Sequence, residues 1–179
     1  MTIRWSLSYA EAEAVLARLH GAREDVQKNA FRGRLKHLKR LGIPLNSSPG
    51  RGSKVDYFED ELFQWAFSLE LAEFGIDPST IARLVEAEWA KGILPEFQKA
   101  REIRNHDVFF VMNPRMVIDA WDPKPFDYEW LKASDGKLLR RLTSAKRRAI
   151  VINVSELARQ IGVASVAFHS ARHAKDDEG

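Results

Sequence analysis

Cysteine is absent from this 179-residue chain, and tyrosine and methionine occur only three times each. Without cysteine the chain has no disulfide, no thiol nucleophile and no thiolate metal site. No window approaches the roughly 18 apolar residues that a membrane-spanning helix needs, and residues 1–6 lack the apolar run of a signal peptide. With 45% apolar and 30% charged residues, the composition predicts a cytoplasmic protein with a hydrophobic core and no membrane partner.

Acidic residues are scarce in one part of the chain and cations in the next. Residues 18–54 hold ten Lys and Arg and only two acids, a net charge of +8, whereas residues 55–90 hold nine acids and one Arg. The whole-chain charge of +3 hides this polarity. Positive charge concentrated on one helix and one loop indicates a nucleic-acid contact.

Hydrophobic periodicity and capping residues predict helices over about 9–20, 24–41, 60–74 and 78–91. Ser8 and Glu11 have the spacing of a capping box ahead of the first helix. Residues 44–53 contain two Pro and two Gly among small polar residues, so they are expected to form a loop. Residues 54–58 are expected to return as a short strand that closes a β-wing.

The second half of the chain has a different character. Residues 107–112 and 115–121 are β-type runs around Asn113-Pro114, which predicts a hairpin. A loop with one helical turn near 128–132 is expected next, then a third strand over 148–154 and a helix capped by Ser155. The predicted fold class is α+β: a mainly α winged helix-turn-helix domain over 1–100, a small α+β dimerisation or regulatory domain over 105–168, and a disordered tail over 169–179.

Three short motifs in the first half resemble those of a known family. The run 35–43, Leu-Lys-His-Leu-Lys-Arg-Leu-Gly-Ile, is similar to the family pattern Leu-Arg-Tyr-Tyr-Glu-Arg-x-Gly-Leu that ends the second helix. Tyr57 to Leu62 is similar to Tyr-x-x-x-Asp-Leu, and 75–81 to Gly-Phe-Ser-x-x-x-Ile. In this order, over about residues 8–90, they resemble the DNA-binding domain of MerR-type transcription regulators. The resemblance implies a winged helix-turn-helix that binds duplex DNA.

The chain departs from that family in four respects. His37 and Leu38 replace the two helix-2 tyrosines, and Gly52 with Lys54 stand where the family wing has Gly-Tyr-Arg. The long coiled-coil dimerisation helix is missing, and the β-containing segment after Arg104 takes its place. The metal-sensing cysteines are absent, so the resemblance implies no metal role.

Eight candidate DNA-contacting residues lie on the second helix and the expected wing: Lys28, Asn29, Arg32, Lys36, Lys39, Arg40, Arg51 and Lys54. Four of these cations fall within about 80° of one helical wheel. Such a row is usually only a solvated helix face, but acids are not interleaved here, which favours a DNA contact. Asn29 and Arg32 are expected to reach base edges. Lys36, Lys39 and Arg40 are expected to contact phosphates, and Arg51 and Lys54 the minor groove or phosphates.

Catalytic, cofactor and metal sites are not predicted, so the chain is not expected to be an enzyme. The five histidines lack metal-ligand spacing with a carboxylate partner. The acids at 56–61 suit a helix N-terminus, where they complement the macrodipole.

The predicted function is a sequence-specific transcription regulator of double-stranded DNA, acting as a homodimer on an inverted-repeat operator. The C-terminal domain would join the two copies, through the apolar runs 108–112 and 150–154. Two alternatives stay open: an architectural, excisionase-like protein that bends DNA, and a protein-interaction module that uses the basic face. Operator sequence, activation or repression, and a small-molecule effector are left undecided.

Overall fold

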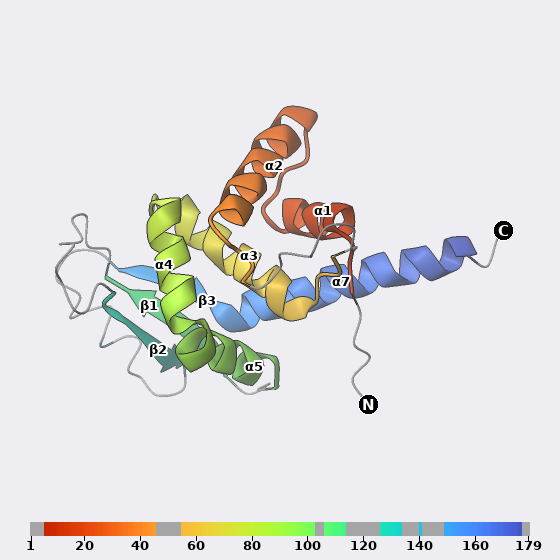
Figure 1. Cartoon of the computed structure of the whole chain (residues 1–179). Helices are drawn as coiled ribbons and strands as arrows, with labels where there is room; N and C mark the ends of the chain where they lie inside the picture. The colour runs from red at the N-terminus through yellow and green to blue at the C-terminus, as the bar shows by residue number, and fades with distance from the viewer. Residues whose placement is uncertain are drawn as a thin grey trace.

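The computed structural model of the chain describes residues 6–45, 55–102, 106–113, 126–133, 140 and 149–176, with side chains to residue 168. Helices surround a central helix and a three-stranded antiparallel sheet lies at one end, so the fold is α+β (Figure 1). The elements are α1 (Tyr9–Leu19), α2 (Asp25–Arg40), α3 (Glu59–Glu73), α4 (Pro78–Glu88), the π-helical turn η1 (Trp89–Ile93), α5 (Leu94–Glu102), β1 (Val108–Met112), β2 (Tyr128–Lys132), β3 (Ile150–Asn153) and α7 (Val154–Asp176).

Helix α3 forms the centre of the molecule because α1, α4 and α7 all pack against it. The predicted inward residues Leu62, Trp65, Ala66 and Leu69 are buried. Phe63 and Phe67 on the other side are buried as well. The Phe63 ring stacks on Phe97 with 3.9 Å between ring centroids, and the Phe67 ring lies edge-on to Phe110 with 5.0 Å between centroids. The prediction of a single buried side was therefore incomplete, because α3 is buried on two sides. Phe74, also expected inside, is 52% exposed.

The first three helices lie within one residue of their predicted limits. The fourth prediction, a helix to about residue 91, is wrong at its end, since α4 stops at Glu88 and the chain continues through η1 into α5. Gly92 lies in η1, where a Cβ would meet the Tyr128 hydroxyl at 3.4 Å. Helix α5 was not predicted as a separate helix, and the burial of Phe97 and Ala100 holds it against the body.

The sheet has the order β2-β1-β3, and β1 pairs antiparallel with both neighbours. The expected turn at 128–132 is wrong: these residues form β2, in which Trp130 pairs with Phe110 of β1. The expected hairpin partner, 115–121, lies outside the described residues. The third strand is confirmed at Ile150–Asn153.

Helix α7 differs from the prediction at both ends. Asn153 Oδ1 accepts the Glu156 amide at 2.9 Å, while Ser155, the expected cap, accepts the Val108 amide at 3.0 Å. The expected disordered tail over 169–179 is wrong as far as Asp176, because α7 stays helical to that residue and extends beyond the body (Figure 1).

The two predicted domains share one hydrophobic core. Buried residues from α1 to α5 and from β1, β3 and α7 form a single cluster. The apolar runs expected to join two copies contribute to it, since Phe110, Ile150 and Ile152 are buried within the chain. Strand β1 has both edges paired. Among the described strands, β2 and β3 each have one edge without a strand partner.

Candidate nucleic-acid interface

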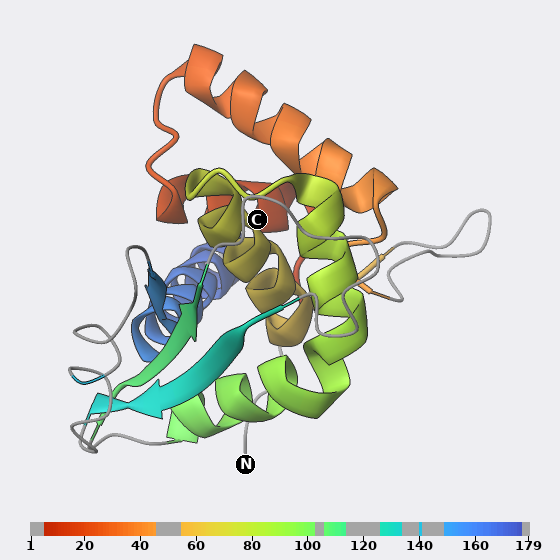
Figure 2. The ribbon, with the colours of Figure 1, turned by 90° about the vertical axis from the view of Figure 1, so that its left-hand side faces the viewer.

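The corner between α1 and α2 is fixed by local capping. The Ser8 hydroxyl accepts the Glu11 amide while Glu11 accepts the Ser8 amide at 2.8 Å, which is the predicted capping box. Gly21, with φ of +68°, ends α1 in a conformation that suits glycine. Gln27 Oε1 then accepts the Glu24 amide at 3.1 Å to start α2. As a result α2 lies across one edge of the molecule (Figures 1 and 2).

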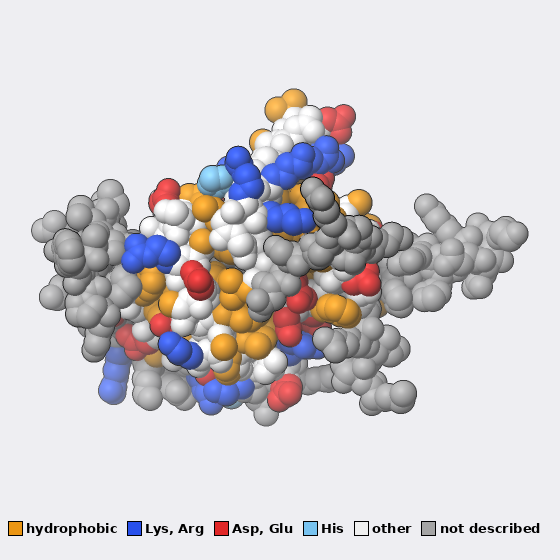
Figure 3. Space-filling model, viewed as in Figure 1, with side chains coloured by type: hydrophobic (Ala, Val, Ile, Leu, Met, Phe, Trp, Pro, Cys, Tyr) orange, Lys and Arg blue, Asp and Glu red, His pale blue; other side chains and the backbone are white. Residues whose placement is uncertain are grey.

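Three residues of α2, Phe31, Leu35 and Leu38, are buried and attach the helix to the body. All three belong to the predicted buried face. Ala30, also expected there, is exposed, and Leu41 is only partly buried. Lys and Arg side chains gather along the exposed parts of the helix (Figure 3).

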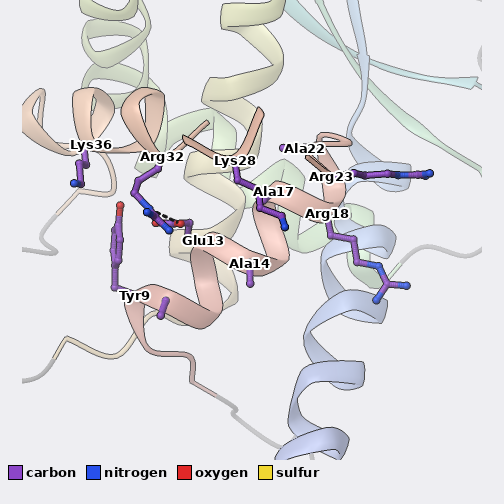
Figure 4. A pocket seen from close by; sticks show the side chains of 11 residues that line it. Tyr9, Glu13, Ala14, Ala17, Arg18, Ala22, Arg23, Lys28, Arg32 and Lys36 are labelled. Atoms are coloured by element: carbon purple, nitrogen blue, oxygen red, sulfur yellow. Dashed lines mark hydrogen bonds and ion pairs between the residues drawn. The ribbon is translucent and has the colours of Figure 1, made fainter. Parts of the chain in front are cut away.

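An open groove runs between α1 and α2 (Figure 4). Five cations lie along it, two from the end of α1 and the turn and three from α2: Arg18, Arg23, Lys28, Arg32 and Lys36. Glu13 is the one carboxylate among the described residues that line it. Such an excess of positive charge in a groove attracts polyanions.

Arg32 forms an ion pair within this groove. Its Nε donates to Glu13 Oε1 at 2.8 Å, with the Glu13 side chain 13% exposed and the Arg32 side chain 49% exposed. The Tyr9 hydroxyl is buried without a hydrogen-bond partner among the described residues, and it points toward α2 (Figure 4). Arg32 therefore faces α1 as part of the groove wall.

Lys39 is also held by aromatic residues. Its Nζ donates to the Tyr57 hydroxyl at 3.1 Å and lies 5.1 Å from the Tyr9 ring centroid. Tyr57 itself is fully buried and pairs with Leu7 through two backbone hydrogen bonds of 2.8 Å. Within the described residues, the expected return strand over 54–58 is represented by this isolated Leu7–Tyr57 bridge. Lys39 thus bonds within the fold.

The other predicted residues of α2 are exposed. Lys28 pairs with Asp25 at 3.4 Å, and an Arg40 nitrogen lies 3.1 Å from His37 Nδ1. Lys36 makes no ion pair within the described part of the chain, and Asn29 lies on the exposed surface. Arg51 and Lys54, the wing candidates, lie outside the described residues.

Arg18 and Arg23 belong to the basic stretch 18–54, but the sequence predicts no contact for either of them and no role for Glu13. A local pattern holds no signal for these residues, because the groove forms only when α1 packs beside α2.

Two partly buried titratable residues, His20 and Glu70, lie behind α2. The His20 ring is tilted against Phe31, and burial lowers the pKa of His20 below its ordinary 6.5, although Glu73 raises it. Burial raises the pKa of the neighbouring Glu70 carboxyl, and Glu73 adds to this. Across the described residues, no group of three or more His, Asp or Glu side chains is placed to hold a metal ion. No described helix is long and apolar enough to cross a membrane.

No protein-family model matches this chain, and no curated protein is significantly similar to it.

Proposed function

We propose that this chain is a sequence-specific double-stranded DNA-binding transcription regulator that docks through α1 and α2. One observation carries the proposal: five cations from two helices line a single open groove in which the described residues include one carboxylate. Phosphate contacts supply much of the affinity of a protein for DNA, and a groove of this charge suits one phosphate strand.

The element order of residues 8–90 supports the finer part of the proposal, a MerR-like winged helix-turn-helix. Helix α2 follows α1 through a glycine turn, and Asp77 caps α4 by accepting the Ser79 amide at 2.9 Å. The motifs at 35–43, 57–62 and 75–81 fall at the end of α2, at the start of α3 and at the α3–α4 turn. In this proposal the protein acts as a homodimer on an inverted-repeat operator, because a symmetric site needs two reading heads.

Selection of bound fragments from random duplex DNA tests the function directly. An enriched motif with two inverted half-sites supports a dimeric regulator. Enrichment without a motif contradicts sequence-specific binding and favours an architectural protein. If low salt gives no retention of any duplex, the proposal is wrong and the basic groove has another partner.

Charge substitution tests the placement of the site. The double variant Arg18→Gln/Lys36→Gln should lower the slope of log affinity against log salt by about 1.8, since each phosphate contact adds about 0.9. The matched control is Arg83→Gln/Lys91→Gln, which removes the same charge from exposed positions outside the groove. An equal loss in both variants would contradict a localised interface.

A further inference from the structure

Within residues 25–33, the side of α2 that lies opposite its buried residues carries a strip of uncharged residues. Val26, Asn29, Ala30 and Gly33 are all exposed, and Val26 is 80% exposed. At about 100° per residue they lie opposite the buried residues of the helix. Ala30 and Gly33 also line an open groove between α2 and the α3–α4 turn, which Gly75, Ile76 and Pro78 border on the other side.

Gly33 has no role in the fold that would require glycine. It lies in the interior of α2, and a Cβ added to it would meet nothing within 4 Å. Glycine weakens a helix interior because it loses more backbone freedom on folding than alanine. A glycine at such a position suits the close approach of another molecule to the backbone.

Cations lie on both sides of this strip. Lys28, Arg32 and Lys36 line the groove beside α1. Arg34 lies on the other side, where its exposed guanidinium pairs with Glu73. A helix with its side chains is about 10–12 Å across, close to the roughly 12 Å width of the major groove. Cations on both flanks would face the two phosphate walls, and the neutral strip would face the base edges.

We propose that this strip is the base-reading edge of α2, with A·T pairs as its ligand. Gly33 lets the helix backbone approach the bases, Val26 meets a thymine methyl group, and Asn29 bonds to adenine N6 and N7. Val26 and Asn29 lie in the first turns of the helix, the part that contacts bases in helix-turn-helix proteins. Arg32, bound to Glu13, then belongs to the groove and not to a base. The inference rests on the proposed DNA binding and adds its specificity.

Gly33→Ala tests the close approach by separating stability from recognition. In the absence of DNA, alanine should raise the thermal midpoint by about 2–4 °C, because it has a higher helix propensity than glycine and meets no neighbouring atom. Affinity for the selected site should fall about tenfold, as for one mismatched base pair. Affinity for random duplex, which depends on phosphate contacts, should stay within about twofold. Gly162→Ala in α7, where a Cβ also meets nothing, is the matched control and should leave both affinities unchanged.

Val26 is tested by replacing each thymine of the selected site with uracil, one at a time. At one thymine per half-site the wild-type chain should lose about fourfold in affinity, the effect of one buried methyl group. Val26→Ala should show no difference between thymine and uracil at that position. Equal sensitivity of both chains at every position overturns the assignment of Val26.

The inference and the function fail in different ways. If the wild-type chain binds a selected site and Gly33→Ala binds it as tightly, the base-reading edge is wrong while DNA binding stands. If the wild-type chain retains no duplex at low salt, the proposed function fails and this inference fails with it.

Discussion

Arg32 of α2 donates a hydrogen bond through Nε to Glu13 of α1 at 2.8 Å, across the groove that separates the two helices. The two residues are 19 positions apart in the sequence. Glu13 is the less exposed partner, and four other cations line the same groove. The carboxylate therefore offsets part of the positive charge at the surface proposed to bind phosphate.

Glu13→Gln should strengthen binding to duplex DNA. The amide removes one negative charge and leaves the Arg32 guanidinium available for a phosphate, so the salt slope should increase by about 0.9. Affinity is measured by fluorescence anisotropy over a range of salt. Glu86→Gln, at an exposed position of α4, is the control for the change in net charge. Weaker binding by Glu13→Gln would mean that the carboxylate helps to position the groove.

Lys39→Met should lower stability but leave the salt slope unchanged. Methionine keeps the aliphatic stem but loses the hydrogen bond to Tyr57 and the contact with the Tyr9 ring. The expected loss is about 1 kcal/mol in the free energy of unfolding, measured with urea. A salt slope lower by a full contact would instead show that Lys39 binds phosphate, as the sequence predicted.

His20 should make stability depend on pH below about 6.5, its ordinary pKa. Burial lowers its folded-state pKa, so the unfolded chain takes up the proton first as pH falls. Glu70 Oε1 lies 3.7 Å from His20 Nδ1, too far for a good hydrogen bond to offset the burial. The stability contribution is complete above pH 6.5 and is lost as pH falls through the folded-state pKa.

His20→Gln should reduce this loss, as measured by the thermal midpoint at pH 7.5 and pH 5.5. The raised pKa of Glu70 acts in the opposite sense, since its contribution is lost as pH rises above about 4.5. Comparing the variant with the wild-type chain at each pH isolates the histidine. Parallel curves for the two chains would show that His20 does not titrate differently on folding.

Gln64→Leu should destabilise the chain by about 1 kcal/mol, because the partly buried Leu45 amide loses its acceptor. The Gln64 side chain is 3% exposed, and its Oε1 accepts the Leu45 amide at 2.7 Å. Leucine has a similar volume but no acceptor. Chemical denaturation measures the loss, and Gln64→Glu, which keeps an acceptor, should retain more stability near the pH at which the carboxyl is neutral.

The sequence was most informative where structure is local. Helices α1, α2 and α3 begin and end near their predicted residues because their apolar period and capping groups act within a few positions, as Ser8 and Glu11 do. It failed at β2, where Tyr128 to Lys132 has no strong local pattern. That strand exists because it pairs with β1 and places Trp130 against Phe110, a partner 20 residues earlier.

The same division applies to the candidate interface. The amino-acid sequence shows that positive charge is concentrated in residues 18–54 and that α2 carries most of it. That Arg32 faces Glu13 and that Lys39 contacts Tyr57 follows from the packing of the helices and is visible only in the folded chain. Local periodicity gives the angle of a side chain around its own helix. The neighbour that it meets depends on how distant elements pack around α3, and no short pattern in the sequence records that packing.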